Sequence, residues 1–245
     1  MRTLVSRRRS IGNSDRVFRL APLQESILLQ ALSSPEPGTG LQQVVVRLPL
    51  SPNGAILRRA WERVVARHSA LRTRFRWKGL DEAQQEVEQV SPIPFRELNW
   101  GGLPRAEQSL ALARFLEDDR LQELPFRQVP LLRITLVSAG EDAAWLVCSV
   151  HSIVADRPSL GRVLQEVMAE YAGEGHQQPN DAARAPFRDF VERLHDKPSA
   201  PSEEFWRQQM RDVGPATQLP RSQDGVSSGS PAVGDVQSRL SRDAT

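Results

Sequence analysis

The sequence predicts an α/β fold, a two-layer sandwich in which helices pack on a mixed sheet. Short runs of apolar and β-branched residues, typical of strands, lie between longer segments whose apolar residues recur at helical spacing. The two kinds of segment follow no regular repeat, which is typical of an open α/β or α+β layer. With 245 residues, of which 39% are hydrophobic, the chain is large enough to bury a core.

The N-terminal part of the chain predicts two helices and a strand. Residues 1–16 are polar, and we expect them to be flexible. Pro22 suits the first turn of a helix, which ends before Pro35. A β-branched run over 44–48 predicts a strand, and the turn 51–53 can cap the helix that follows. That second helix carries one apolar stripe, formed by Ile56, Leu57, Ala60, Trp61, Val64 and Val65.

The next part of the chain predicts two strands and a further helix. Apolar residues alternate with polar ones over 71–77, which indicates a half-buried strand, and 86–90 is a second candidate strand. A helix is expected over 106–121. Its inward-facing residues are predicted to be Leu110, Phe115 and Leu116.

A hairpin followed by a helix is the best-defined part of the prediction. Strands over 131–137 and 144–151 flank a turn at 140–142. The helix after them begins at Ser159, the expected N-cap. Its apolar residues follow helical spacing closely and are Leu160, Val163, Leu164, Val167, Met168 and Tyr171.

The C-terminal part contains shorter helices and a polar tail. Helices are predicted over 187–195 and over 203–211, the second capped by Ser202. The residues from 213 to 245 include hardly any apolar side chain, and we expect them to be disordered. The folded part of the chain is therefore predicted to span 17–212.

Charge and composition argue against a nucleic-acid-binding protein. The formal net charge is only +2, and basic residues mostly alternate with acidic ones along the predicted helices. The run Arg7 to Arg9 is basic, but the chain has a single tyrosine and no strand with paired aromatic residues on which bases could stack. We therefore expect no nucleic acid among the partners.

Other classes of site are also not indicated. The single cysteine, Cys148, lies in an apolar run and is predicted to be a buried side chain. His68, His176 and His195 show no metal-ligand spacing, so no metal site is expected. The segment 38–40 lacks the flanking strand and helix of a phosphate loop. No apolar run is long enough to span a membrane and no secretion signal is present, which makes a cytoplasmic location the expectation.

The segment 151–157, His-Ser-Ile-Val-Ala-Asp-Arg, is the most informative part of the chain. It connects the predicted strand 144–151 to the helix after it, and such loops often hold functional groups. It is one of five blocks that together, over about 18–220, resemble the condensation domains of nonribosomal peptide synthetases. In chain order the blocks lie at 20–28, 67–73, 151–157, 187–190 and 204–207.

The resemblance implies a fold and a set of partners. Condensation domains are similar to chloramphenicol acetyltransferase and have two lobes that face each other across a tunnel. Every block matched here belongs to the N-terminal lobe, so the resemblance implies a single lobe without its C-terminal counterpart. It also implies a partner carrier protein, whose phosphopantetheine arm presents the substrate as a thioester. No directly bound cofactor is implied.

The family motif HHxxxDG is only half retained in this chain. Its first His corresponds to His151, its second to Ser152, its Asp to Asp156 and its Gly to Arg157. The second His is thought to act as a general base or to orient the attacking amine, for which an imidazole with a near-neutral pKa is suited. A serine hydroxyl cannot accept a proton appreciably at that pH, so catalysis by this loop is predicted to be impaired. Ser152 is also a poor candidate nucleophile, because no Gly-x-Ser-x-Gly elbow surrounds it.

The other motif residues are expected to act structurally. His151 should point away from the pocket that position 152 faces, because adjacent side chains of an extended segment alternate, and its imidazole is expected to hold the loop through backbone hydrogen bonds. Asp156 is either the acid of an ion pair with Arg67 or Arg72, which is our hypothesis, or the cap of the next helix. Arg157 precedes a proline, which favours an extended backbone and disfavours the positive φ available to glycine.

Two functions fit these observations. The first is a truncated or split condensation domain, whose C-terminal lobe or synthetase module lies on another polypeptide or is lost. The second is a non-catalytic interaction module that docks carrier proteins or tailoring enzymes. A lobe that normally packs against another leaves an apolar face exposed, so self-association is also expected.

Overall fold

A computed structural model gives the structure of the protein. It describes residues 16–33, 36–89, 92–140, 143–173, 186–197 and 200–214. The chain divides into two units, residues 1–198 and 199–245. The N-terminal segment expected to be flexible, the tail expected to be disordered, His176 and most of the turn at 140–142 lie outside the described residues, apart from Arg16, Gly140, Val213 and Gly214.

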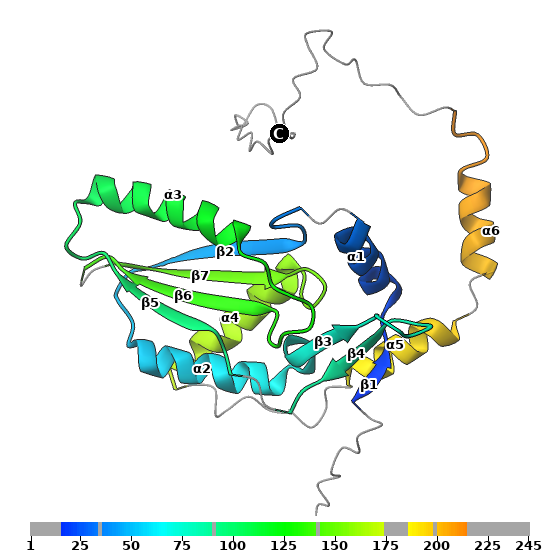
Figure 1. Ribbon diagram of the computed structural model, residues 1–245, viewed down its shortest axis with the longest axis horizontal. Coiled ribbons are helices and arrows are strands. Elements are labelled where there is room, and N and C mark those ends of the chain that lie inside the picture. The colour runs from blue at the N-terminus through cyan, green and yellow to red at the C-terminus, as the bar shows by residue number, and fades with distance from the viewer. Residues whose placement is uncertain are drawn as a thin grey trace, which may run out of the picture. The chain divides into compact units, whose positions relative to one another are not determined.

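The first unit contains a four-stranded mixed sheet with the order β2-β7-β6-β5 (Figure 1). Strands β6 (Leu132–Ser138) and β7 (Ala144–His151) pair antiparallel, which confirms the predicted hairpin. Strand β2 (Leu41–Leu48) pairs antiparallel with β7 along its whole length. Strand β5 (Phe95–Asn99), which pairs parallel to β6, was not predicted, because its Arg, Glu and Asn residues give no strand-like alternation.

A second, three-stranded sheet has the order β1-β4-β3. Strands β1 (Val17–Arg19) and β3 (Thr73–Arg76) both pair antiparallel with β4 (Gln84–Val87). The predicted strand 71–77 begins instead with a short 3-10 helix, Ser69–Arg72. Strand β4 begins two residues before the predicted strand 86–90. The residue that faces the core there is the polar Gln85, so no apolar pattern marks the start of the strand.

Helices α2 (Gly54–Arg67) and α4 (Arg157–Tyr171) pack on one face of the four-stranded sheet (Figure 1). The Asn53 side chain caps α2 by accepting a hydrogen bond from the Ile56 N–H, as the turn sequence predicted. The predicted apolar stripe of α2 is buried except for Ile56, which is 41% exposed. The core between helices and sheet includes Leu57, Trp61, Val64, Leu132, Ile134, Leu146, Leu160, Val163 and Val167.

Helix α3 (Arg105–Leu121) lies over the opposite face of this sheet (Figure 1). The prediction that Leu110 points inward is wrong, because its side chain is 52% exposed. Phe115 is half-buried and makes an edge contact with Trp100. The fully buried residues of α3 are polar, Gln108 and Asp119, so polar contacts to the sheet fix its rotation.

Two further helices of the first unit, α1 and α5, lie beside the three-stranded sheet. Helix α1 (Pro22–Ser33) contributes Leu28 to a second apolar core with Leu20, Phe75, Leu131 and Ile153. Helix α5 (Phe187–Asp196) contacts β1, and its His195 Nε2 lies 2.8 Å from the Leu20 carbonyl oxygen.

The second unit contains one described helix, α6 (Ala200–Gln209). It begins three residues before the predicted helix 203–211, so Ser202 lies inside the helix and does not cap it. All of its residues are exposed.

Candidate functional site

The motif loop joins β7 to α4 at the point where the two apolar cores meet. Strand β7 ends at His151 and α4 begins at Arg157, so the segment is the strand-to-helix connection that the sequence predicted. Ile153 packs in the core of the three-stranded sheet, whereas Ala155 packs in the core of the four-stranded sheet. Both side chains are buried, and they anchor the loop on its two sides.

The His151 imidazole is buried, and both of its ring nitrogens have backbone partners. Nδ1 accepts a hydrogen bond of 3.2 Å from the Ile153 N–H, and the ring donates to the Thr39 backbone. The Phe126 ring makes an edge contact at a centroid distance of 4.7 Å. Burial lowers the pKa of His151 to about 4, although the hydrogen bond to Thr39 raises it in part. The ring is therefore neutral at pH 7, and it holds the loop to the segment around Thr39.

Gly40 lies directly beside the motif. Its φ is +74°, and a Cβ atom at this position would lie 2.7 Å from Nε2 of His151, so only glycine fits without a shift of the ring. The Ser152 N–H donates to the Gly40 carbonyl oxygen at 2.8 Å, and the Ser152 side chain is half-buried. The segment 38–40 does not fit a phosphate loop, and its sequence predicted no other role. The structure shows that this segment positions both His151 and Ser152.

A cavity of about 200 Å³ opens beside the motif, and His151 forms part of its wall. Ser152 is not one of its lining residues. The pleat at the end of β7 places His151 on the α3 side of the sheet, and the pocket expected at position 152 stays a prediction. Other residues around the cavity include Leu32, Thr39, Leu41, Leu124 and Phe126, with Glu36 and Glu123.

The ion pair expected between Asp156 and Arg67 or Arg72 is not formed. Asp156 is exposed, and its Oδ1 accepts a hydrogen bond of 2.8 Å from the Ser159 N–H, so it caps α4. Hydrogen bonds from Ser159 hold the pKa of Asp156 below its usual value. The alternative, a helix cap, is therefore the one that the structure supports. An exposed carboxylate needs no buried arginine, because water and the helix N-terminus already stabilise its charge.

The start of α4 corrects two further expectations. The N-cap is Asp156 and not Ser159 as expected, and the Ser159 N–H donates a hydrogen bond to the Asp156 side chain. Arg157 is the first residue of the helix and is not extended, although Pro158 follows it. Proline is tolerated here because the N–H groups of a first helical turn have no partner inside the helix.

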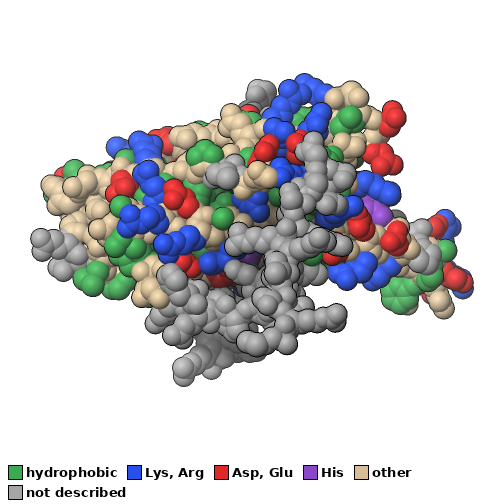
Figure 2. Space-filling model, turned by 90° about the horizontal axis from the view of Figure 1, so that it is seen from below, with side chains coloured by type: hydrophobic (Ala, Val, Ile, Leu, Met, Phe, Trp, Pro, Cys, Tyr) green, Lys and Arg blue, Asp and Glu red, His purple; other side chains and the backbone are tan. Residues whose placement is uncertain are grey.

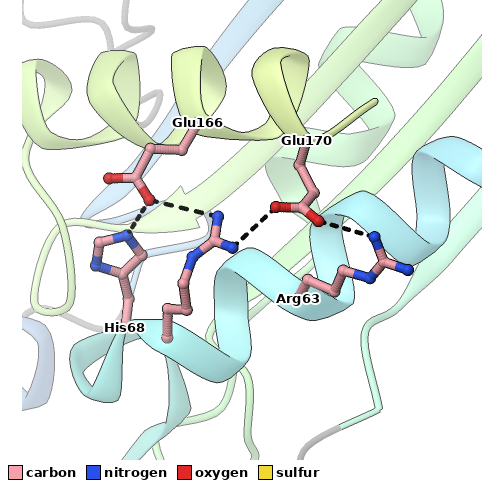
Figure 3. A network of polar contacts seen from close by, with 5 residues as sticks. Arg63, His68, Glu166 and Glu170 are labelled. Carbon is pink, nitrogen blue, oxygen red and sulfur yellow. Dashed lines mark hydrogen bonds and ion pairs between the residues drawn. The ribbon is translucent and has the colours of Figure 1, made fainter. Parts of the chain in front are cut away.

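Arg67 and His68 instead join α2 to α4 (Figure 3). Arg67 Nη1 lies 2.9 Å from Oε2 of Glu170, and Arg63 Nη1 lies 2.8 Å from Oε1 of the same carboxylate. His68 Nε2 lies 2.8 Å from Glu166. The hydrogen bonds from Arg67 and Arg63 hold the pKa of Glu170 below its usual value. This network clamps the two helices together at a distance from the motif loop.

The Arg72 side chain bonds to backbone carbonyl groups close to it. Its Nε donates to the Val65 carbonyl at 3.1 Å, and its Nη1 donates to the Glu88 carbonyl. These bonds tie the end of α2 to the segment after β4. Neither arginine of the matching block is thus available to the motif aspartate.

A buried glutamine pair, which was not predicted, also holds the motif loop. Gln24 Nε2 donates to the Ile153 carbonyl at 3.0 Å, and its Oε1 accepts from the Gln85 side chain at 2.9 Å. Gln85 in turn donates to the Arg19 carbonyl at 2.9 Å. Gln24 lies in the block 20–28 that carries the family resemblance, and that placement was the available signal. The motif loop is thus fixed from α1, β4 and the 38–40 segment together.

Other site classes find no support in the described residues. In the described ranges no cluster of His, Cys, Asp and Glu could hold a metal ion, and no helix there could cross a membrane. Cys148 is buried, and burial raises the pKa of its thiol. On the coloured part of the face drawn in Figure 2, arginines and lysines are interspersed with acidic residues.

Comparison with protein families gives one match over nearly the whole chain. The sequence model of the condensation domain family matches residues 14–244. A curated relative, a linear gramicidin synthase polypeptide of Brevibacillus parabrevis, is 30% identical over 217 residues. The match covers 86% of this chain and 3% of the relative. The chain thus spans only a small part of the length of that relative.

Solved structures show the same fold. The cyclization-docking bidomain of EpoB from Sorangium cellulosum matches with a TM-score of 0.70 and 22% identity, over 87% of this chain and 43% of that chain. The starter condensation domain of rhizomide synthetase matches with a TM-score of 0.69 and 16% identity, over 81% of this chain and 48% of that chain. The chain spans about half of each of these structures.

Proposed function

The chain belongs to the condensation domain family, and we propose that it forms the N-terminal lobe of a condensation domain that has lost base catalysis at its motif loop. The observation that carries this proposal is the pair His151 and Ser152. The imidazole that remains is buried, neutral and hydrogen-bonded to backbone, while a hydroxyl occupies the position of the family's catalytic imidazole. The length matched in solved condensation domains, about half, supports the assignment to one lobe.

The proposed chemistry follows from what a condensation domain does. An acceptor amine attacks the thioester carbonyl of a donor. The C–N bond forms and the C–S bond breaks, the amine loses a proton, and the thiol that leaves takes one up. A general base at this point typically contributes about a hundredfold to ten-thousandfold. Ser152 remains protonated near pH 7, and the pKa of His151, about 4, makes its imidazole a weak base. The loop therefore lacks a group that can take the proton.

The proposed partner is a carrier protein whose phosphopantetheine arm carries the acyl or aminoacyl group. The chain itself is proposed to hold no cofactor, and the arm enters with its carrier. Carrier proteins of a synthetase are cytoplasmic, which is the location we propose for this chain. A C-terminal lobe or a synthetase module is proposed as a second partner, because the solved relatives continue beyond the matched part.

An amide-forming assay tests the proposal. The purified chain is mixed with donor and acceptor carrier proteins, each loaded with an aminoacyl group, and products are followed by intact-protein mass spectrometry. We expect no amide above the level without the chain, and the same result for Ser152→Ala. Product that the unaltered chain forms and that Ser152→Ala abolishes would contradict the proposal.

A non-catalytic interaction module is the second candidate function, and exposed leucines on α1 favour it. Leu29 is 67% exposed and Leu32 45%, and they lie about one helical turn apart; Leu23 is 72% exposed. Exposed apolar side chains that lie together often mark a protein contact. Biolayer interferometry with phosphopantetheinylated carrier protein tests this function. We expect binding that Leu29→Lys weakens and that Leu110→Lys, a matched exposed leucine on α3, leaves unchanged. Absence of binding to the unaltered chain would refute the module.

A further inference from the structure

Strand β2 forms one edge of the four-stranded sheet and has no neighbour on its outer side among the described residues. It is eight residues long, and every residue from Leu41 to Leu48 is in register with β7, so no bulge interrupts it. Its sequence contains neither proline nor lysine, and Val45 at its centre is 38% exposed. Natural proteins usually protect a sheet edge with bulges, prolines, lysines or other charges; β2 carries one such charge, the exposed Arg47 near its end, and none at its centre.

The hydrogen bonds at the end of β7 show which backbone groups of β2 point outward. The Ser152 N–H bonds to Gly40, toward β2, whereas the His151 N–H bonds to Leu131, toward β6. Because bonding direction alternates along an antiparallel strand, the even-numbered residues of β2 bond to β7. The N–H and carbonyl groups of Gln43, Val45 and Arg47 therefore point away from the sheet. In the part of the chain that the structure describes, these groups have no hydrogen-bond partner.

The opposite edge of the same sheet is protected. Strand β5 has only five residues and carries charged side chains at Arg96 and Glu97. Arg58 of α2 donates to the Phe95 carbonyl at 3.4 Å and lies over the Phe95 ring at 5.1 Å. A short, charged and partly covered edge resists pairing with another chain. The two edges differ in length, charge and cover, and only the β2 edge suits a further strand.

We propose that the β2 edge is a self-association surface, on which β2 of a second copy pairs antiparallel about a two-fold axis at Val45. In this register Val45 lies opposite Val45, and Gln43 lies opposite Arg47. Each outward-pointing residue then exchanges an N–H and a carbonyl bond with its opposite number. The two four-stranded sheets become one continuous sheet, and the axis makes the interface isologous.

Side chains on both faces of the strand fit this register. Val44 and Val46 face the core under α2 and α4, and in the dimer they lie opposite Val46 and Val44 of the second copy. The two Arg47 side chains do not oppose each other, because the register places them four residues apart, roughly 13 Å along the strand. The strand is thus complementary to itself, which favours a second copy over an unrelated strand.

Disulfide trapping tests the register. Val45→Cys places two thiols in a hydrogen-bonded pair with a Cα separation of about 5.5 Å, within the range of a disulfide. The native Cys148 is buried and does not compete. Arg47→Cys is the matched control, since its thiols would be too far apart. We expect a covalent dimer on oxidation with Val45→Cys and little with Arg47→Cys; equal yields, or no dimer with Val45→Cys, would overturn the proposal.

Sedimentation velocity tests the surface independently. Val45→Pro removes the outward N–H at the axis without removing a bond to β7, so the fold should be retained, which circular dichroism checks. We expect a dimer for the unaltered chain, a monomer for Val45→Pro and a dimer for Leu29→Lys, which alters the exposed surface of α1. A monomeric unaltered chain, or a Val45→Pro dimer, would overturn the proposal. Neither result bears on the proposed function.

Discussion

The face of the four-stranded sheet under α2 and α4 is packed with aliphatic side chains, whereas the face under α3 depends on the buried carboxylate of Asp119. On the first face, Val64, Leu146 and Val163 belong to one continuous apolar core. On the second, Asp119 receives hydrogen bonds from Arg133 at 2.5 Å, from Gln43 at 2.7 Å and from Ser149. One sheet is thus attached to its helices by two different kinds of interaction.

The two kinds of attachment respond differently to substitution. An apolar core distributes its stabilisation over many side chains, so that the loss of one polar contact beside it is tolerated. A buried ion pair concentrates its effect in two residues, and removing one partner leaves the other charge buried. Burial alone would raise the pKa of Asp119, but the bonds from Arg133 and Ser149 outweigh it and lower that pKa. The α3 face should therefore be the more vulnerable to a single polar change.

The largest effect is expected from Asp119→Asn. Arg133, whose side chain is 14% exposed, would lose its partner, and the free energy of unfolding should fall by about 3 to 5 kcal/mol. Urea unfolding measures this change. Asp118→Asn, on the same helix but exposed, is the control and should change little. A loss as small as that of the control would show that the α3 face does not depend on the pair.

A smaller effect on the same face is expected from acid. The pKa of His151 is about 4 in the folded chain and about 6.5 when unfolded, so the unfolded state binds more protons between these values. The contribution of the neutral ring to the free energy of unfolding is complete above about pH 6.5. It falls by about 3 kcal/mol as the pH drops to about 4. Thermal unfolding from pH 7 to 4 measures the slope. His151→Gln should flatten it, and an unchanged slope in that variant would contradict the assignment.

On the α2 and α4 face, Glu170→Gln should cost less than Asp119→Asn. The Glu170 side chain is 4% exposed and pairs with Arg63 and Arg67, but the aliphatic core beside it remains intact. We expect a loss of about 2 kcal/mol, typical of hydrogen bonds to a charged group. Chemical denaturation compares it with Glu62→Gln, an exposed control on α2. A loss larger than that of Asp119→Asn would show that the α2 and α4 face is the more sensitive of the two to a single polar change.

The smallest effect is expected at Asp156. Loss of the cap in Asp156→Ala should cost about 1 kcal/mol, whereas Asp156→Asn should retain nearly full stability, because asparagine caps helices equally well. Differential scanning calorimetry on both variants distinguishes a cap from an ion pair. An equal loss in both variants would favour a charge interaction with arginine and would count against the geometry described here.

The elements that bury apolar side chains could be predicted from the sequence. The stripe of α2, the hairpin of β6 and β7 and the helix α4 were all found from spacing alone, because each buries aliphatic residues against the same core. Strand β5 and the orientation of α3 were not, since charged residues and a buried carboxylate leave no apolar pattern. Leu110 is an example: its hydrophobicity predicted an inward position, but the buried polar residues of α3 set the rotation of the helix and leave Leu110 exposed.

The candidate site was predictable as a segment but not as a set of contacts. The resemblance pointed to 151–157 and predicted Ser152 to be the substituted position. It did not reveal that Thr39 and Gly40 hold the loop, because those contacts join positions over a hundred residues apart in the chain. The partner of Arg67 was also misjudged: a carboxylate one helix away, Glu170, lies closer than the motif aspartate.

The most direct test of the central claim is nitrogen NMR of the His151 ring. We expect a single neutral tautomer, with the proton on Nε2 and Nδ1 accepting from the Ile153 N–H, that persists from pH 7 to pH 5. Such a ring is a structural group, and the motif loop then contains no free base. A ring that titrates near pH 6.5, or that exchanges between tautomers, would show an available imidazole and would contradict the account.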